Sequence, residues 1–186
     1  MGGDQEIPGA GRMKTLILLR HAKSSWKDPG IKDRDRPLNK RGKRDAPFMG
    51  RRLASRALPV DLILTSPAKR ARQTAGYVAR ELGYPEEEIL LVERLYAADG
   101  DDLLAVLNDV EDQVQCLMLV GHNPEFTLLA SQLAGLEIAT IPTSGMIGLT
   151  FPVDSWHHLG TGISTQLFVD FPKNSEHGTG IETYEP

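Results

Sequence analysis

KTLILL, from Lys14 to Leu19, is a short apolar run that ends at the charged pair Arg20-His21. A continuous apolar run of this length is typical of a β-strand that is buried on both faces. Strands of this kind occur in parallel sheets that are covered by helices on both sides. The stretch therefore predicts a central strand of an α/β fold, with two polar side chains where the strand ends.

The rest of the chain alternates between strand-like runs and segments with helical spacing of apolar residues. Further strands are predicted at Val60 to Thr65, Ile89 to Val92, Gln115 to Val120, Gly145 to Phe151 and Thr165 to Phe171. Helices are predicted from Asn39 to about Ala57, from Ser66 to about Leu82, from Asp101 to Val110 and from Asn123 to about Leu133. Ser66-Pro67 and Asn123-Pro124 each have the pattern of an N-cap followed by proline. This alternation predicts a three-layer α/β/α sandwich around a largely parallel central sheet.

Length and composition indicate an ordinary globular chain. With 186 residues, we expect one domain at 13–172, a flexible N-terminal tail at 1–12 and a C-terminal tail at 173–186. No apolar run approaches the roughly 18 to 20 residues of a membrane span, so we expect no membrane partner. The N-terminus lacks the apolar core of a signal peptide, and the one cysteine, Cys116, has no partner for an internal disulfide. Both observations favour a cytoplasmic location.

Charge is distributed unevenly along the sequence. Twelve Lys or Arg residues and four Asp residues lie between Lys23 and Arg56, whereas Lys173 is the one basic residue beyond Leu95, against thirteen acids. A basic end of the molecule would attract an anionic ligand or an acidic partner, although such a run is also typical of a solvated helix face. Because the run has few interleaved aromatic residues and is diluted by acids, it does not predict nucleic-acid binding.

Four polar residues follow three of the predicted strands: Arg20, His21, Arg70 and His122. The carboxyl ends of parallel strands meet at one edge of a sheet, where ligands of open α/β folds bind. Two arginines and two histidines beside helix N-termini suit a compact oxyanion with two charges, and phosphate is the obvious candidate. Taken singly, each residue could equally be an ordinary core or surface side chain.

The remaining histidines, His157, His158 and His177, have no strand-end context, and the five histidines show no metal-ligand spacing. The glycines match neither a P-loop nor a dinucleotide-binding fingerprint. We therefore expect no metal and no cofactor.

Three segments carry a resemblance to a known family: LLRHAKSSW (Leu18 to Trp26), TSPAKRARQTA (Thr65 to Ala75) and LVGHNPE (Leu119 to Glu125). In this order they resemble the three signatures of the histidine phosphatase superfamily. The short chain and the RHAKSSW form resemble its small bacterial phosphohistidine phosphatase branch. The resemblance implies a phosphoglycerate mutase-like α/β fold, which agrees with the independent pattern of strands and helices.

The resemblance also implies roles for the strand-end residues. His21 would be the nucleophile, and Arg20, Arg70 and His122 would hold the phosphoryl oxygens without a metal ion. The glycine usual after the histidine is replaced by Ala22. Ser24 and Ser25 stand near where other members place polar contacts to phosphate, so we include both as candidate substrate-binding residues.

The general acid is less well defined. Glu93 resembles the glutamate that protonates the leaving oxygen in mutase-like relatives, but Asp99, Asp101 or Asp102 could reach the same region, and Glu93 could equally be a surface acid. The leading hypothesis is a phosphatase that removes phosphate from phosphohistidine in a protein. The alternatives are a phosphatase for small phosphate esters, such as sugar phosphates or nucleotides, and a non-catalytic module that binds a phosphorylated partner.

Overall fold

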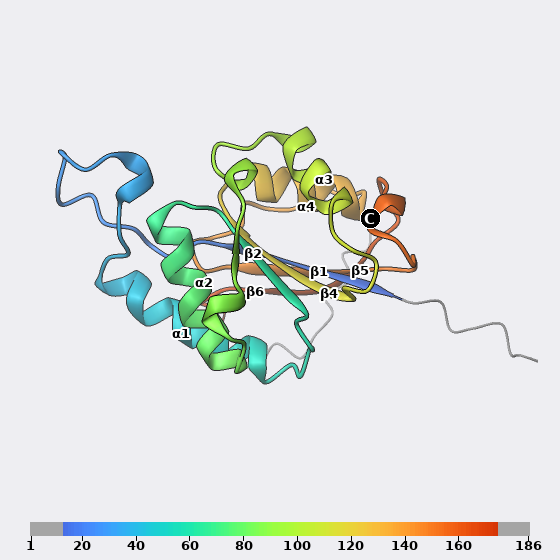
Figure 1. Ribbon diagram of the computed structural model, residues 1–186, viewed down its shortest axis with the longest axis horizontal. Helices are drawn as coiled ribbons and strands as arrows, with labels where there is room; N and C mark the ends of the chain where they lie inside the picture. The colour runs from blue at the N-terminus through green and yellow to red at the C-terminus, as the bar shows by residue number, and fades with distance from the viewer. Residues whose placement is uncertain (1–12, 175–186) are drawn as a thin grey trace, which may run out of the picture.

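A six-stranded β-sheet lies between two layers of helices in the computed structural model of the protein (Figure 1). The structure describes residues 13–174. The predicted tail at 1–12, residues 175–186 of the predicted C-terminal tail, and His177 lie outside the described residues.

The sheet has the strand order β3-β2-β4-β1-β5-β6, and all six predicted strands are present within one or two residues of their expected ends. They are β1 (Lys14–Arg20), β2 (Leu62–Thr65), β3 (Leu90–Leu91), β4 (Cys116–Gly121), β5 (Met146–Phe151) and β6 (Thr165–Asp170). The pairs β1–β4, β2–β4 and β2–β3 are parallel, whereas β5 runs antiparallel to both of its neighbours. The prediction of a largely parallel sheet is confirmed.

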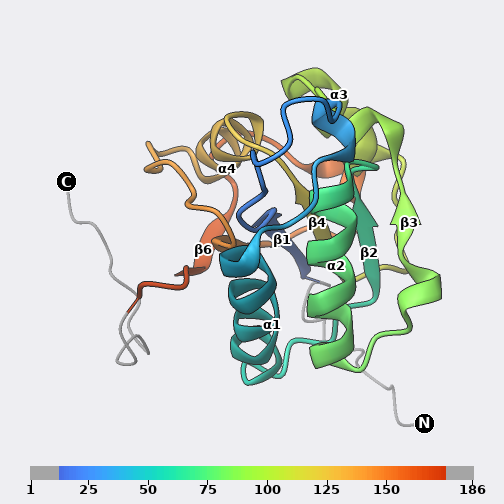
Figure 2. The same cartoon turned by 90° about the vertical axis from the view of Figure 1, so that its left-hand side faces the viewer.

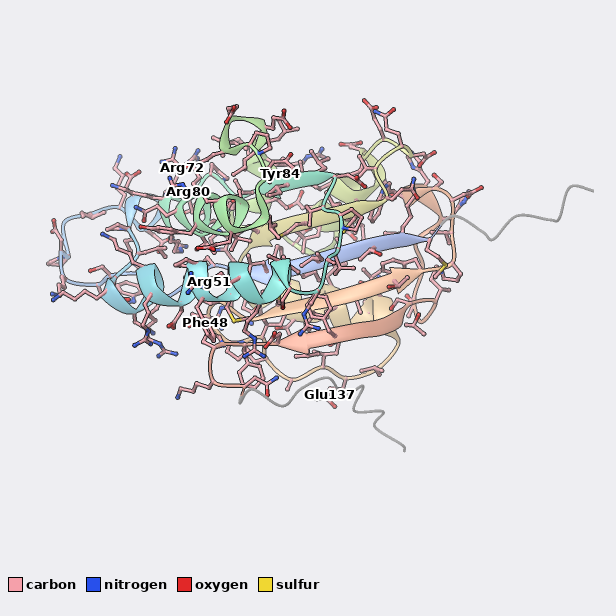
Figure 3. The ribbon with its side chains drawn as sticks, turned by 90° about the horizontal axis from the view of Figure 1, so that it is seen from below. Phe48, Arg51, Arg72, Arg80, Tyr84 and Glu137 are labelled. Carbon is pink, nitrogen blue, oxygen red and sulfur yellow. The ribbon has the colours of Figure 1, made fainter. Side chains whose placement is uncertain are left out.

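Two helices cover each face of this sheet. The four helices are α1 (Lys40–Ala54) and α2 (Lys69–Leu82) on one face, and α3 (Gly100–Asn108) and α4 (Glu125–Ala134) on the other (Figure 1). Figure 3 shows α1 and α2 side by side along their face. Single-turn 3₁₀ helices lie at Asp33–Asp35, Glu86–Glu88, Glu93–Leu95 and Trp156–His158. Among the described helices, none is long and apolar enough to cross a membrane.

Alternation along β1 explains why both faces need a helix layer. Ile17 and Leu19 pack in the apolar cluster that contains α1 and α2, whereas Leu16 and Leu18 pack in the cluster that contains α3 and α4. All four side chains are fully buried, so the strand lies at the centre of the molecule. The apolar run therefore supplies two hydrophobic cores at once, and the three-layer prediction is confirmed.

Two predicted helix starts are wrong. Helix α2 begins at Lys69 with Ala68 as its N-cap, and α4 begins at Glu125 with Pro124 as its N-cap; neither cap makes a side-chain hydrogen bond. Both polar side chains expected to cap these helices have distant partners, although the Ser66 hydroxyl also accepts from the Ala68 N–H at 3.3 Å. The Ser66 hydroxyl lies 2.8 Å from His122 Nε2, and Asn123 Nδ2 donates to the Ile141 carbonyl at 3.0 Å. Ser66 therefore makes a local bond and a distant one, whereas Asn123 bonds to a neighbouring loop, and both helices begin two to three residues later than their capping patterns predict.

Candidate active site

The two histidines leave the sheet from adjacent parallel strands. Arg20, the last residue of β1, is in register with Gly121, the last residue of β4, and the backbone N–H of His21 donates to the Gly121 carbonyl at 2.9 Å. His21 and His122 therefore follow the same edge of the sheet, and their ring centroids are 5.0 Å apart. Figure 2 views the molecule from this edge. The expected meeting of the strand ends is found in the structure.

Arg70 reaches the pair from the first turn of α2. Its Nε–H donates to His21 Nε2 at 3.3 Å, and the side chain is almost fully buried. The N-terminal amides of α2 add positive potential at the same place. A buried guanidinium beside two imidazoles can bind a phosphoryl group through parallel N–H donors.

The tautomer of His21 follows from its partners. Nδ1 lies 2.8 Å from the carbonyl oxygen of Ala22, which can only accept a hydrogen bond, so Nδ1 carries the proton. Nε2 then holds the lone pair, and this is the atom beside Arg70. The backbone N–H of Ala22 is itself anchored on the Thr74 hydroxyl at 3.0 Å. The ring is therefore held with its nucleophilic nitrogen toward the cationic group.

Both imidazoles are neutral near neutral pH. Burial is the main cause that lowers the pKa of His21 to about 3; the hydrogen bond to Ala22 opposes it, and the charges of His122, Arg70 and Arg20 act in the same direction as burial. Burial likewise lowers the pKa of His122 to about 4, helped by Arg70 and opposed by Asp33. A neutral His21 keeps the Nε2 lone pair that an attack on phosphorus requires.

Arg20 supplies a second guanidinium from the end of β1. Its Nη1 donates to the Ile141 carbonyl at 2.7 Å, whereas its buried Nε has no partner among the described residues. Burial also lowers the pKa of this guanidinium. Because an unpaired buried donor is costly, an oxyanion that accepts from Arg20 Nε would offset that cost. The residues at this edge thus fit a phosphate group.

Asp33, which we did not predict as a site residue, holds the far side of Arg70. Its carbonyl accepts from Arg70 Nη1 at 2.7 Å, and its Oδ2 accepts from Arg70 Nη2 at 3.0 Å and from the Tyr96 hydroxyl at 3.1 Å. Its Oδ1 accepts from Arg36 Nη1 at 2.8 Å. Burial raises the pKa of this carboxyl, but Arg70 and Arg36 outweigh it and lower the pKa overall. Asp33 is therefore a charged anchor that orients Arg70.

His122 has two further neighbours that the sequence did not reveal. Ser66 shares a hydrogen bond with Nε2 of the ring, and the Tyr96 ring meets it edge-on with centroids 6.0 Å apart. Ser66 lies in one of the three quoted motifs, but its position before Pro67 predicted a helix cap and not a contact with His122. Tyr96 comes from the segment after β3, so its sequence position carried no signal.

The other candidates lie in different environments. The Ser24 hydroxyl accepts from Arg36 Nη2, and the Ser25 hydroxyl accepts from the backbone N–H of Lys27 at 3.2 Å, so both organise the loop after His21. Glu93 makes a bidentate ion pair with Arg34, at 2.6 and 2.9 Å, and its side chain is 70% exposed.

The three aspartates that we considered as alternative acids lie near the start of α3. Asp99 and Asp102 form a capping box there, with Asp99 Oδ1 accepting from the Asp102 N–H at 2.9 Å. Asp101 is an exposed residue of the same first turn. None of the three has a described hydrogen bond or ion pair to the two histidines or to Arg20 and Arg70. Within residues 13–174 no group of three or more His, Cys, Asp or Glu side chains could hold a metal ion.

Comparisons with known proteins identify the family and the fold. Residues 16–102 match the sequence profile of the histidine phosphatase superfamily, branch 1. An uncharacterized protein of Mycobacterium tuberculosis is 38% identical over 134 residues, which are 72% of this chain and 81% of that protein. SixA of Agrobacterium tumefaciens superposes with a TM-score of 0.74 at 30% identity, over 86% of this chain and 98% of SixA. The protein histidine phosphatase SixA in complex with tungstate shares the fold, with a TM-score of 0.73, 22% identity and coverage of 85% and 97%.

An α/β fold with an arginine and histidine cluster at the carboxyl edge of its sheet defines a phosphate-handling protein of the phosphoglycerate mutase-like type. The chain belongs to the histidine phosphatase superfamily, and it is a phosphatase similar to SixA in size and fold. The family and the fold predicted from the three motifs are confirmed.

The low imidazole pKa values lead to a direct test. We expect the NMR chemical shifts of the His21 and His122 rings to keep their neutral-imidazole values from about pH 8 to about pH 5. Over this range an ordinary histidine with a pKa near 6.5 becomes protonated. Added inorganic phosphate should raise both pKa values, because the dianion stabilises the imidazolium form. A midpoint near 6.5 for either ring in the free protein would contradict the described burial.

Asp33→Asn should lower kcat/KM by about 10- to 100-fold, because the charge that orients Arg70 is lost and small displacements of a phosphate-binding group are costly. Asp35→Asn is the matched control, since Asp35 lies in the same 3₁₀ turn, is exposed and has no ion pair among the described residues. Equal losses in the two variants would mean that the loop tolerates no charge change, and would remove the specific role of Asp33.

Proposed function

We propose that the protein hydrolyses phosphohistidine in a protein substrate through a phosphohistidine formed on His21. The single observation that carries this proposal is the orientation of the His21 ring. Its Nδ1 proton is held by the Ala22 carbonyl, so the Nε2 lone pair lies beside the Arg70 guanidinium, where a phosphoryl group would bind. Arg20, Arg70 and His122 would surround the phosphoryl oxygens.

The first step transfers the phosphoryl group to the enzyme. His21 Nε2 donates its lone pair to phosphorus, and the bond between phosphorus and the substrate nitrogen breaks. The bonding electrons leave on the substrate imidazole. Because solvent can protonate the far nitrogen of that ring beforehand, the ring departs as a neutral imidazole. The arginines stabilise the charge on the equatorial oxygens.

The second step returns the enzyme to its starting state. With Nδ1 protonated and Nε2 bonded to phosphorus, the His21 ring carries a positive charge, which the Ala22 carbonyl stabilises. Water attacks phosphorus, the Nε2–P bond breaks, and its electrons return to Nε2. The released phosphate keeps the oxygen and one proton of the water, and the second proton passes to solvent. This proton balances the one that the substrate ring took from solvent in the first step, so the cycle consumes one water.

The position of Glu93 supports phosphohistidine over an alcohol phosphate as substrate. An imidazole with a pKa near neutrality is a far better leaving group than an alkoxide, so it depends less on a general acid. Glu93 is exposed and forms an ion pair with Arg34, an arrangement that suits a reaction with little need of a general acid. The similarity to SixA, a protein histidine phosphatase, favours the same substrate class.

A phosphatase for small phosphate esters is the second candidate, and the ion pair of Glu93 with Arg34 bears on it. Both side chains are largely exposed, at 70% and 44%, so the pair is only weakly held and Glu93 could be released to act as the acid. In that case Glu93→Gln would cost about 10² to 10⁴ in rate on an alkyl phosphate.

Substrate preference tests the proposal. We expect kcat/KM for a chemically phosphorylated histidine peptide to exceed that for a panel of sugar phosphates and nucleotides, and Glu93→Gln to change hydrolysis of the peptide less than tenfold. Release of inorganic phosphate is the common measurement for every substrate. A large preference for the small esters, together with a large loss in Glu93→Gln, would establish the second candidate instead.

Trapping tests the nucleophile. Incubation with a labelled phosphodonor, followed by rapid quenching, should leave acid-labile and alkali-stable phosphate on His21, since phosphoramidates hydrolyse in acid. His21→Ala should carry no label. The control is His157→Ala, which removes an exposed histidine far along the chain and should label normally. Label that persists in His21→Ala would refute the mechanism.

A further inference from the structure

Exposed cations without partners gather around the candidate active site. Between residues 23 and 69, six exposed lysines make no ion pair with a described residue: Lys23, Lys27, Lys32, Lys40, Lys43 and Lys69. The arginines of the same region are paired instead, as with Arg34 on Glu93 and Arg41 on the buried Asp45. The charges of these six lysines are therefore available to a partner outside the molecule.

The chain path places these lysines at the edge of the sheet that carries His21 and Arg70. Lys23 follows His21 by two residues, and its carbonyl accepts from the backbone N–H of Asn39 at 2.9 Å, which brings the start of α1 to the same loop. Lys69 directly precedes Arg70 at the start of α2. Figure 2 shows the N-terminal ends of both helices beneath the loop that follows β1. Lys23, Lys69 and the lysines at the start of α1 thus lie on segments that meet at this edge.

The charges at these helix ends oppose the helix dipole. The first turns of α1 and α2 contain basic residues and no acidic residue. Cations are unfavourable at a helix N-terminus, where acids are the stabilising choice. A local arrangement that lowers stability without a partner inside the fold points to a functional use of the charge.

Trp26 adds an aromatic side chain to the same surface. Its side chain is 73% exposed, and the Arg36 guanidinium lies 3.2 Å from its ring centroid. Arg36 in turn donates to Asp33, which holds Arg70. Exposed tryptophan and arginine side chains are enriched in protein interfaces.

We propose that Trp26 and the six lysines form a docking surface for an acidic protein surface that surrounds the phosphorylated histidine of the substrate. This inference rests on the proposed function and names how its substrate is recognised. The charges lie outside the phosphoryl pocket, so they would act on a partner much larger than a phosphate ester. Opposite charges speed encounter, and the effect falls as salt screens them.

A protein partner fits this surface better than a nucleic acid or a membrane. The net charge of the chain is −4, so only this end of the molecule would attract a polyanion. The aromatic contribution comes from Trp26 alone, whereas single-stranded nucleic acids are bound by several stacked aromatics. In the described loop that carries Lys27 and Lys32, the exposed large apolar side chains are Trp26 and Ile31, which is less than the continuous apolar face of a helix that enters a lipid surface.

The test compares two histidine peptides of equal length, each phosphorylated chemically with phosphoramidate. In one the histidine is flanked by glutamates and in the other by serines. We expect kcat/KM at low salt to be about tenfold higher for the acidic peptide, and the difference to vanish at high salt. Equal rates for the two peptides at low salt would overturn the proposal.

A pair of double variants separates the surface from net charge. Lys40→Glu/Lys43→Glu changes the first turn of α1, and Arg51→Glu/Arg80→Glu makes the same change of charge near the far ends of α1 and α2, where Figure 3 labels both arginines. The lysine variant should lose the tenfold preference and keep its rate on p-nitrophenyl phosphate within about threefold. Its Tm should not fall, because acids suit a helix N-terminus. If the arginine variant loses the preference equally, the surface has no specific role.

Tryptophan fluorescence gives a readout that does not depend on catalysis. Trp26 is exposed and Trp156 is fully buried, so acrylamide quenching reports mainly on Trp26. With His21→Ala, the unphosphorylated acidic peptide should protect Trp26 and the serine peptide should not. This measurement also distinguishes failure of the docking surface from failure of the proposed function. If the acidic peptide protects Trp26 in His21→Ala but the wild-type protein does not hydrolyse the phosphopeptide, the proposed function is refuted and the docking surface stands. Stronger protection by single-stranded DNA or anionic vesicles than by the acidic peptide would overturn the docking proposal.

Discussion

The parallel pairing of β1 with β4 is the constraint on which the site depends. Because Arg20 is in register with Gly121, the residues that follow both strands leave the sheet together, and the two imidazoles meet at 5.0 Å. A shift of one residue would turn every side chain of β1 to the opposite face and separate the rings. The two hydrophobic clusters, which need alternate residues of β1, enforce this register. Packing of the core thus sets the geometry of the chemistry.

The site brings positive groups together at a cost that the surrounding structure limits. Two guanidiniums and two imidazoles cannot all be charged in a partly buried space, and the histidines respond by staying neutral. Asp33 balances Arg70, while the Ala22 carbonyl accepts the remaining proton of His21. A bound phosphate would add the negative charge that this arrangement lacks. Affinity for an oxyanion is therefore a property of the whole cluster.

Much of the fold and the central part of the site could be predicted from local patterns. Buried strands have continuous apolar runs, and the residues after them stand at one edge whenever the strands are parallel, so Arg20, His21, Arg70 and His122 could be grouped in advance. The helix starts were harder to predict, because Ser66 bonds to His122 as well as to the Ala68 N–H, and Asn123 bonds to Ile141. A capping pattern describes a local possibility, and distant partners compete with it.

Residue type and spacing along the chain were enough to predict the alternation of strands and helices, the family and the four residues at the strand ends. The folded structure was needed to find that Asp33 orients Arg70, that Tyr96 and Ser66 contact His122, and that Glu93 pairs with Arg34. These contacts join segments that are far apart in the chain. The spacing of residues along the chain does not predict these contacts, because they depend on how the loops pack against the sheet in the folded protein.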